Sequence, residues 1–446
     1  MGNQLVINIF YDICLMSLVF FIAKIIRIKF KVMQRLYVPS AFIAGFLCLF
    51  FGKQFINLIP FSDSISEYSG ILITIVFATM FLGNKETIRF KTMLNKAGNS
   101  FFVNFFAEVC QFGIFILIGV LGLPLIFKGI NEAFGLLAPA GFFGGHGSAI
   151  AIGSALAESG FEEAISVGQT FATIGLFCGI ILGVIYINIG TKKHYTKFIK
   201  NANSIPEEML TCLVHEDDRE PLGKETINSM SLDSLSWHLS LVLVAVGAAY
   251  LLNSGLKMVL PGVSFPVYGL ALICSVILQY ITKLLKLDNY IDKQTITHIG
   301  SSATDYLIAF GIASIDIGVV IKYWLPILLL SVLALIWVTF VLFVVSRKFF
   351  DDHWFERGIY VFGMSTGVMA TGVILLRIVD PKYESGILED FGLAWIFLSF
   401  IDMMIISLSP LFITTGYGLL WGALCVISAL ISLYLCKKQS HEKGLD

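Results

Sequence analysis

The chain alternates long apolar runs with short polar segments, and this pattern predicts a bundle of membrane-spanning helices. A helix needs about 20 mostly apolar residues to cross roughly 30 Å of hydrocarbon. Runs of this kind are predicted at 5–26, 36–59, 67–83, 99–127, 164–189, 237–260, 265–285, 296–320, 323–346, 389–412 and 414–436. The first run ends in cations without a small-residue cleavage site, so we expect a retained span rather than a cleaved signal.

The composition supports the same fold class. Apolar residues make up 57% of the chain and charged residues only 14%, against roughly 25% charged in a soluble domain. A soluble globule of this length would have to expose much of that apolar surface to water. The composition therefore excludes a soluble enzyme, a disordered chain and a nucleic-acid-binding protein. It predicts an all-α polytopic membrane protein surrounded by lipid.

The distribution of Lys and Arg predicts the orientation. If the N-terminus lies outside, 26 of the 30 cations fall in inside segments, as the positive-inside rule requires. The four outside cations are Lys53, Lys128, Lys257 and Lys322. We therefore expect a multi-pass protein of the cell membrane with its N-terminus outside and its C-terminus in the cytoplasm. This count requires that two glycine-rich stretches, 134–158 and 357–380, do not cross the membrane fully.

The longest polar stretch, 190–236, predicts a cytoplasmic linker between two similar halves. The halves, 1–189 and 237–412, each contain five spans and one glycine-rich stretch before the last span. Because five is odd, the second half starts from the opposite side, which predicts an inverted repeat of the kind common in secondary transporters. Residues 413–446 then form an additional span and a cytoplasmic tail. The expected total is about 11 transmembrane helices.

The two glycine-rich stretches predict re-entrant hairpins. The first contains Gly-Gly-His-Gly-Ser at 144–148, and the second runs from Gly363 to Gly372. Glycine lets the backbone leave helical geometry, and irregular backbone inside a bilayer must be buried in protein or line a cavity. Each hairpin would place a helix N-terminus, which attracts carboxylates, near the midplane. The alternative is that these glycines only permit close helix packing.

The hairpins supply the candidate anion-binding residues. These are Gly144, Gly145, His146, Gly147, Ser148, Met364, Ser365, Thr366, Gly367 and Arg377. His146 has two interpretations, a donor to a carboxylate or a neutral ring that fixes the hairpin backbone. Arg377 can likewise pair with a carboxylate or extend to the inner surface.

Oxygen-bearing residues within the spans are candidate sodium ligands, because hard cations take oxygen donors. The set is Thr170, Thr173, Ser301, Ser302, Thr304, Asp305 and Asp402. The alternatives are that the threonine hydroxyls bond their own helix backbone and that Asp305 is solvated near the inner end. Asp12 and Glu108 are isolated in apolar runs, where we expect structural pairing between spans. No cofactor is expected beyond sodium as a coupling ion.

An enzyme or a channel is disfavoured. The chain has no His-Glu-x-x-His sequence and no paired intramembrane aspartates of protease type. A channel would show a pore-lining ring of charge or a short filter repeat, and neither is evident. We therefore expect a protein that is not an enzyme.

These features resemble the bacterial sodium:glutamate symporter family. The likeness rests on Gly-Gly-His-Gly-Ser at 144–148, the Thr-Phe-Ala-Thr-Ile-Gly segment at 170–175, the two-half plan and Phe-Ile-Asp at 400–402, over about 5–412. It implies an inverted-repeat fold, two hairpins, a homodimer and a transport domain that moves against a scaffold. It also implies sodium-coupled import of glutamate or a related acidic amino acid by alternating access. Another organic anion, or coupling to protons, is the alternative.

The sequence departs from the family pattern in three places. The second glycine-rich stretch is more apolar, which bears on the substrate. The span at 414–436 is additional, and the linker at 190–236 is longer and more charged.

Overall fold

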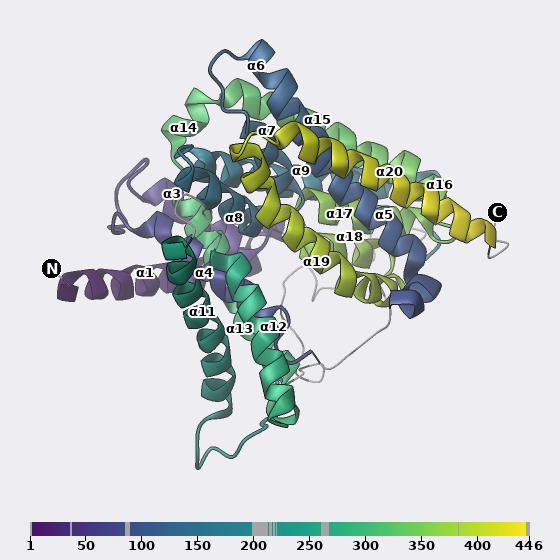
Figure 1. The fold of residues 1–446 in the computed structure, drawn as a ribbon. Helices are drawn as coiled ribbons and strands as arrows, with labels where there is room; N and C mark the ends of the chain where they lie inside the picture. Colours follow the sequence, from purple (N-terminus) through teal and green to yellow (C-terminus); the bar gives the residue numbers. More distant parts are fainter. Residues whose placement is uncertain are drawn as a thin grey trace. The chain divides into compact units, whose positions relative to one another are not determined.

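The computed structural model describes residues 2–35, 38–84, 90–198, 213, 216, 219, 221–259, 267–381 and 383–442. Within these ranges the regular structure is helical, without a strand (Figure 1). Eight of the described helical segments are long and apolar enough to cross a membrane. This confirms the predicted class, a polytopic all-α membrane protein.

The eight long segments follow the predicted spans closely. They are α1 (Gly2–Lys29), α5 (Phe90–Leu117) with η1 (Ile118–Gly122) and α6 (Leu123–Ile126), α9 (Ala164–Lys192), α11 (Ser234–Val259), α12 (Val267–Leu284), α15 (Trp324–Phe340) with η4 (Val341–Ser346) and α16 (Arg347–Phe349), α19 (Ile387–Thr414) and α20 (Gly418–Glu442). Both η1 and η4 are π-helical turns inside otherwise continuous helices.

The remaining helices are shorter or more polar. They are α2 (Lys31–Arg35), α3 (Ser40–Phe51), α4 (Ile65–Thr79), α7 (Phe134–Phe142), α8 (Gly145–Glu158), η3 (Asp288–Tyr290), α13 (Lys293–Ala313), α14 (Ile317–Lys322), α17 (Trp354–Thr366) and α18 (Met369–Val379).

Three predicted spans differ in extent from the helices observed. The run 36–59 contains the 12-residue α3, and the run 67–83 overlaps the 15-residue α4, which begins at Ile65 and ends at Thr79. Leu36 and Tyr37 lie outside the described residues. The run 296–320 is not one helix, because α13 ends at Ala313. Asp316 starts the separate α14, and its side chain accepts hydrogen bonds from the amides of Gly318 and Val319. Because Asp316 caps the start of a new helix, the run does not form the single long helix that its apolar composition predicts.

The chain forms two compact units, and each combines segments from both predicted halves. The first unit is Met1–Lys31, Val38–Thr87 and Thr211–Ile315, and the second is Val32–Tyr37, Ile88–Leu210 and Asp316–Asp446. The compact units thus divide the chain differently from the predicted repeats, 1–189 and 237–412. The inverted repeat itself stays a prediction. Much of the predicted linker 190–236 lies outside the described residues.

The first unit packs α4 against α11, α12 and α13. The Lys293 ammonium donates to three carbonyls at the end of α4, those of Thr79, Met80 and Leu82, at 2.8–3.2 Å. These carbonyls are the acceptors that a helix end leaves unsatisfied. Asp12, buried in α1, accepts from the Ser62 amide at 3.1 Å and from the Tyr68 hydroxyl at 2.5 Å. Asp12 therefore has the structural pairing expected of it.

In the second unit, α20 lies along α5 (Figure 1). The Ser432 hydroxyl donates to the Phe102 carbonyl at 3.3 Å, and the Gln439 amide donates to the Leu94 carbonyl at 2.5 Å. Gly113 of α5 faces Cys425 and the carbonyl of Gly422. The helix that the sequence presents as additional is therefore packed along the length of α5.

Candidate functional site

The first glycine-rich stretch forms a hairpin, α7 and α8, that lies on the first half of α9. The two helices have 9 and 14 residues, about 14 and 21 Å, and neither can span roughly 30 Å of hydrocarbon. Along α7, Phe134 contacts Phe161 and Gly141 contacts Phe171. Along α8 the order reverses, because Ala149 contacts Gly168 and Gly153 contacts Ile165. The chain therefore enters and leaves at the same end of α9.

The second glycine-rich stretch forms a hairpin, α17 and α18, on the other half of α9. These helices have 13 and 11 residues, which again is too short to span the bilayer. Phe355 packs on Gly190, and Thr366 packs on Gly179, so α17 runs against the direction of α9. The return helix α18 places Leu375 on Gly183. Both ends of this hairpin therefore lie near Lys192, at the opposite end of α9.

The two hairpin tips meet at the middle of α9. A Cβ atom added at Gly175 would lie 2.7 Å from the Thr366 carbonyl oxygen and 3.2 Å from the Phe142 ring. At the tip of the first hairpin, Gly145 has a positive φ of 61°, and a Cβ there would lie 2.6 Å from Val368. Only glycine fits this contact without strain. The structure therefore forms a hairpin from each of the two glycine-rich stretches, and the hairpins approach from opposite ends of one long helix, α9.

The contact between the tips, which we call the tip junction (143–148 and 365–369), is lined by helix ends. Helices α8 and α18 both begin there. The first amides of a helix have no intrahelical acceptor, and they carry part of the positive end of its dipole. The carbonyls at the end of α17 supply the complementary acceptors. An anion and a cation can thus both be bound here by backbone groups.

The predicted polar side chains of the tip junction are buried. His146 is 4% exposed, and its Nε2 lies 3.1 Å from the Thr173 hydroxyl. The Ser365 hydroxyl is buried and has no hydrogen-bond partner in the part of the chain that the structure describes. The Thr366 hydroxyl donates to the Phe362 carbonyl at 2.9 Å and is therefore engaged by the backbone. Ser365 is therefore a side chain of the tip junction whose hydroxyl has no hydrogen-bond partner among the described residues.

Residues 363–367 have the Gly-x-Ser-x-Gly spacing of hydrolase nucleophile elbows. That elbow places the serine on a sharp turn between a strand and a helix. Ser365 instead lies within α17, and its hydroxyl has no hydrogen bond to any base. The spacing therefore does not form a nucleophile here.

Three other predicted residues of the second unit lie around the hairpins. Arg377 is eight residues beyond the start of α18, about 12 Å along the helix from the tip. The Thr170 hydroxyl donates to the Ser166 carbonyl at 2.7 Å, which is the helix-backbone bond predicted as the alternative to sodium binding. Asp402 is buried in α19, a helix that packs on α5 and α8. The structure brings none of these side chains into the contact between Gly145 and Val368.

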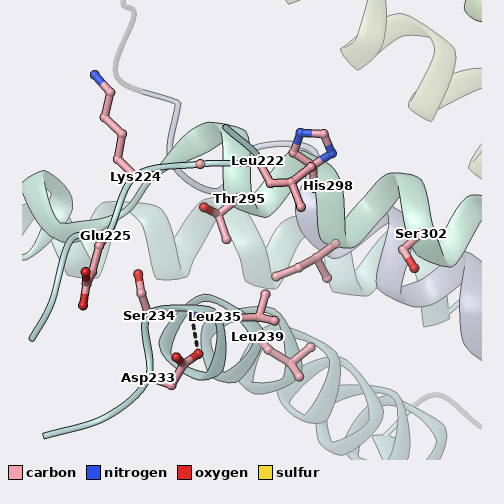
Figure 2. A pocket seen from close by; sticks show the side chains of 12 residues that line it. Leu222, Lys224, Glu225, Asp233, Ser234, Leu235, Leu239, Thr295, His298 and Ser302 are labelled. Carbon is pink, nitrogen blue, oxygen red and sulfur yellow. Dashed lines mark hydrogen bonds between the residues drawn. The ribbon is translucent and has the colours of Figure 1, made fainter. Parts of the chain in front are cut away.

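The other predicted sodium ligands belong to the first unit. Ser301, Ser302 and Asp305 are exposed on α13, and the Thr304 hydroxyl donates to the Gly300 carbonyl at 2.9 Å. Ser302 lines a pocket of about 730 Å³ between the end of the linker, the start of α11 and α13 (Figure 2). The predicted sodium ligands are therefore divided between the two compact units.

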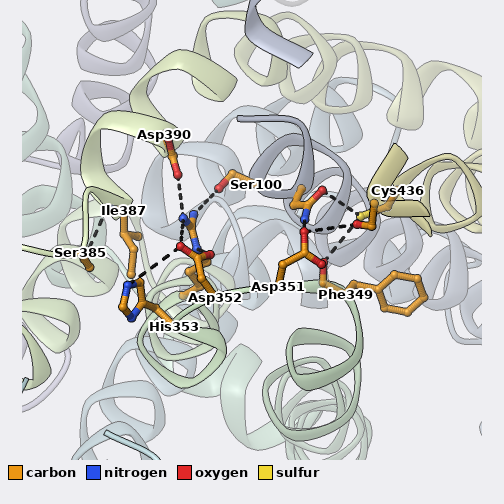
Figure 3. Close-up of polar contacts among 12 residues, drawn as sticks. Ser100, Phe349, Asp351, Asp352, His353, Ser385, Ile387, Asp390 and Cys436 are labelled. Carbon is orange, nitrogen blue, oxygen red and sulfur yellow. Dashed lines mark hydrogen bonds and ion pairs between the residues drawn. The ribbon is translucent and has the colours of Figure 1, made fainter. Parts of the chain in front are cut away.

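Sequence reasoning missed the polar cluster at the base of the second hairpin (Figure 3). Arg357, only 7% exposed, donates to Asp352 at 2.9 Å, to Asp390 at 2.7 Å and to the Ser100 hydroxyl at 3.0 Å. These contacts link the start of α17 to α19 and α5. The signal in the sequence is the pair Asp352 and Arg357, which lie five residues apart after the apolar run 323–346.

Short hairpins whose helix ends meet beside a long spanning helix are typical of one class of protein, the secondary membrane transporters. Over residues 5–384 the chain matches the sodium/glutamate symporter family, and it belongs to that family. Membership indicates a sodium-coupled glutamate symporter and argues against an enzyme. A comparison with curated proteins finds no match. The family match ends before α19, so Asp402 and α20 lie beyond it.

Proposed function

We propose that this protein imports glutamate, or a closely related acidic amino acid, together with sodium by alternating access, and that the tip junction is the substrate site. The observation that carries this proposal is the contact of both hairpin tips at Gly175. A site at the middle of a spanning helix, reached by a hairpin from each end, is what alternate exposure to two faces requires.

The substrate carboxylates would bind the first-turn amides of α8 and α18. His146, Ser148 and Ser365 are side-chain donors of the tip junction, and all three are buried. Amides fixed in a helix give an anion preorganised donors in a medium of low dielectric. Gly144, Gly147, Met364 and Gly367 would shape the walls, and Arg377 is proposed as a more distant cation that supports the bound charge.

Sodium would bind beside the substrate, where its charge offsets that of the carboxylates. The oxygens available in the second unit are the hydroxyls of Thr170 and Thr173 and the carbonyl of Thr366, and Asp402 contributes negative charge from α19. Ser301, Ser302, Thr304 and Asp305 of α13 are proposed as a second group of sodium ligands. Oxygen donors of these kinds suit a hard monovalent cation.

Uptake of labelled glutamate into proteoliposomes tests the function. Uptake should be rapid with an inward sodium gradient and fall to the leak rate when choline replaces sodium. Gly175→Val should abolish sodium-driven uptake because its side chain would overlap both tips. Gly247→Val is the matched control, since nothing lies within 4 Å of a Cβ there. Equal uptake with and without sodium would refute the coupling.

Cysteine labelling tests the hairpin topology and the orientation. In a cysteine-free background, Lys128→Cys and Ser159→Cys flank the first hairpin, and Lys348→Cys and Glu384→Cys flank the second. We propose that an impermeant reagent added outside labels the first pair only, with the N-terminus outside and the C-terminus in the cytoplasm. Labelling of one residue of a pair from each side would refute the re-entrant topology.

We also propose that the protein is a homodimer in lipid. Large apolar side chains are strongly exposed, among them Leu125 at 86% and Leu251 at 77%, which suits contact with lipid or with a second copy. Native mass spectrometry from mild detergent should give twice the 49.3 kDa chain mass. A spectrum of monomers under conditions that preserve uptake would refute the dimer.

A further inference from the structure

Five exposed cations gather at the base of the second hairpin, and we call them the basic patch. They come from the end of α9 with the residues that follow it, and from α16. The members are Lys192, Lys193, Lys197, Arg347 and Lys348. The two segments lie far apart in the sequence, and the fold joins them because Phe355, at the start of α17, packs on Gly190 near the end of α9.

Aromatic rings fix how the two segments of the basic patch meet. Helix α9 ends next to His194, which has a positive φ of 57°, and the Tyr195 amide turns back to donate to the Gly190 carbonyl at 2.8 Å. The centroid of the Tyr195 ring lies 5.1 Å from that of Trp354. The guanidinium carbon of Arg347 lies over the same Trp354 ring, 5.8 Å from its centroid. Trp354 therefore contacts both segments.

The acids of the same region are already engaged by the protein. Asp352 accepts from the buried Arg357 at 2.9 Å, and Asp351 accepts from a side-chain amide of α5 at 2.5 Å (Figure 3). Glu356 is fully buried and accepts from the backbone amide of Lys197 at 2.7 Å. Among the described residues, none of the five cations of the basic patch forms an ion pair with an acid. Their charge is therefore open to an external anion.

The apolar surface beside the basic patch identifies the kind of anion. Ile189 precedes Lys192 by about one turn, and Val344 precedes Arg347 in the same way. Both side chains are exposed, at 37% and 50%. Each helix thus presents a cation at its end and an apolar side chain one turn further in. This order matches a phospholipid, whose charged headgroup lies at the surface and whose acyl chains lie deeper.

The depth and the charge favour an anionic lipid in particular. The basic patch lies at the ends of two spanning segments, where tryptophan and tyrosine rings favour the level of the headgroups. Basic residues at this level bind the phosphates of anionic headgroups, and each contributes about fivefold in affinity. A zwitterionic lipid gains less, because its own ammonium is repelled by the same cations.

We propose that the basic patch binds one anionic phospholipid at the base of the second hairpin. Its phosphate lies between the cations of α16 and those of residues 192–197, and its acyl chains lie along Ile189 and Val344. The bound lipid ties the start of α17 to the ends of α9 and α16. This goes beyond sodium-coupled glutamate transport, because the lipid is a resident partner that is not carried across the membrane.

Native mass spectrometry of the full-length protein in mild detergent tests the site. Phosphatidylglycerol and phosphatidylcholine are added in equal amounts, and the wild type should retain phosphatidylglycerol in preference. The double variant Arg347→Gln with Lys348→Gln removes two of the five cations. It should lower the retention of phosphatidylglycerol at least about tenfold. Circular dichroism checks the fold of each variant, and the wild-type preference is measured without any variant.

A second pair of cations separates a defined site from general attraction to anionic lipid. Lys283 and Lys286 are exposed at the end of α12, and in the proposed orientation they lie at the same face of the membrane. The double variant Lys283→Gln with Lys286→Gln makes the same change in charge. It should leave the retention of phosphatidylglycerol unchanged.

Each outcome decides the proposal. Loss of phosphatidylglycerol from the Arg347 and Lys348 double variant alone supports the site. Equal losses in both double variants, retention that survives in both, or no preference in the wild type overturns it. Displacement of the lipid by millimolar inorganic phosphate also overturns it, because the basic patch would then bind a soluble anion. No transport is measured, so failure here is distinguishable from failure of the proposed function.

Discussion

The two hairpins reach the same point on α9 by different local chemistry. The first is fixed at its tip, by the left-handed Gly145 and by the contact of His146 with Thr173. Near its base lies an ion pair, Lys322 to Glu163 at 2.7 Å, between an exposed lysine and a partly exposed glutamate. The second is fixed at its base by the buried Arg357, and its tip is a short extended break at Val368 with φ −148° and ψ 172°.

This difference shows that the hairpins are equivalent in position and not in sequence. A hairpin needs a break in the helix and an anchor, and either end can supply the anchor. The sequence likeness between the two stretches is accordingly faint, whereas their placement on α9 is symmetric. The following changes test whether tip and base contribute as the structure indicates.

Gly145→Ala should have the largest effect on transport. The residue would adopt a positive φ, at a strain of about 1–3 kcal/mol, and its Cβ would overlap Val368. We expect sodium-driven glutamate uptake to fall at least about tenfold, because 1.4 kcal/mol is tenfold in an equilibrium constant. Gly129→Ala is the control, since it shares the positive φ of 78° and has nothing within 4 Å. Equal losses in both variants would assign the effect to backbone strain alone.

Arg357→Met should have the largest effect on stability. It removes the cation from Asp352 and Asp390 and leaves the Ser100 hydroxyl without this donor, at a cost of about 3 kcal/mol. Thermal unfolding followed by circular dichroism measures the loss. Arg357→Lys should restore only part of it, because one ammonium cannot match the guanidinium geometry. Arg347→Met, at an exposed position over Trp354, is the control and should change the midpoint far less.

Thr173→Val and Thr170→Val form a matched pair on one helix. The Thr173 hydroxyl contacts His146, whereas the Thr170 hydroxyl donates to its own helix at Ser166. Loss of one hydrogen bond is worth about 1 kcal/mol, so Thr173→Val should raise the sodium concentration for half-maximal uptake about fivefold. Thr170→Val should raise it less. A larger rise in that sodium concentration for Thr170→Val than for Thr173→Val would contradict the proposed role of Thr173 at the tip junction.

Lys322→Ala should have the smallest effect, because Lys322 is exposed and Glu163 is only partly buried. The hydrogen bond from Lys322 lowers the pKa of Glu163 below its ordinary value. The stabilisation is therefore present above the ordinary glutamate pKa and is lost as pH falls through the lowered one. Melting temperatures of the wild type and the variant should differ slightly at neutral pH and converge in acid. A difference that grows in acid would contradict this sign.

The local features of the site are predictable from sequence, because helix breaks are encoded locally. The glycine cluster at 144–147 and the stretch Gly363–Gly372 predict both hairpins, and the breaks fall at 143–144 and 367–368. The apolar runs likewise predict the long helices, since length and composition decide whether a segment can span lipid. The position of the two tips along α9 is not predictable in this way, because it depends on long-range packing against that helix.

The long-range contacts are what the sequence could not supply. Ser301 to Asp305 and Thr170 to Thr173 are similar polar faces in the sequence, yet the structure assigns them to different units. Arg357 counts as one more cytoplasmic cation in the topology argument, whereas the fold buries it among Asp352, Asp390 and Ser100. In the sequence Asp402 is an isolated intramembrane acid, whereas in the structure α19 packs on α5 and Glu108 is a neighbour of Asp402.

Because both hairpins pack on α9, the spacing of residues along this one helix sets the position of one hairpin relative to the other. Inserting one residue after Gly175 would advance everything beyond it by about 1.5 Å and rotate it by roughly 100°. Gly179, Gly183 and Gly190 would then turn away from the second hairpin while the first kept its place. The length of α9 between these glycines is therefore constrained more tightly than its composition, and natural variation there should favour substitution over insertion.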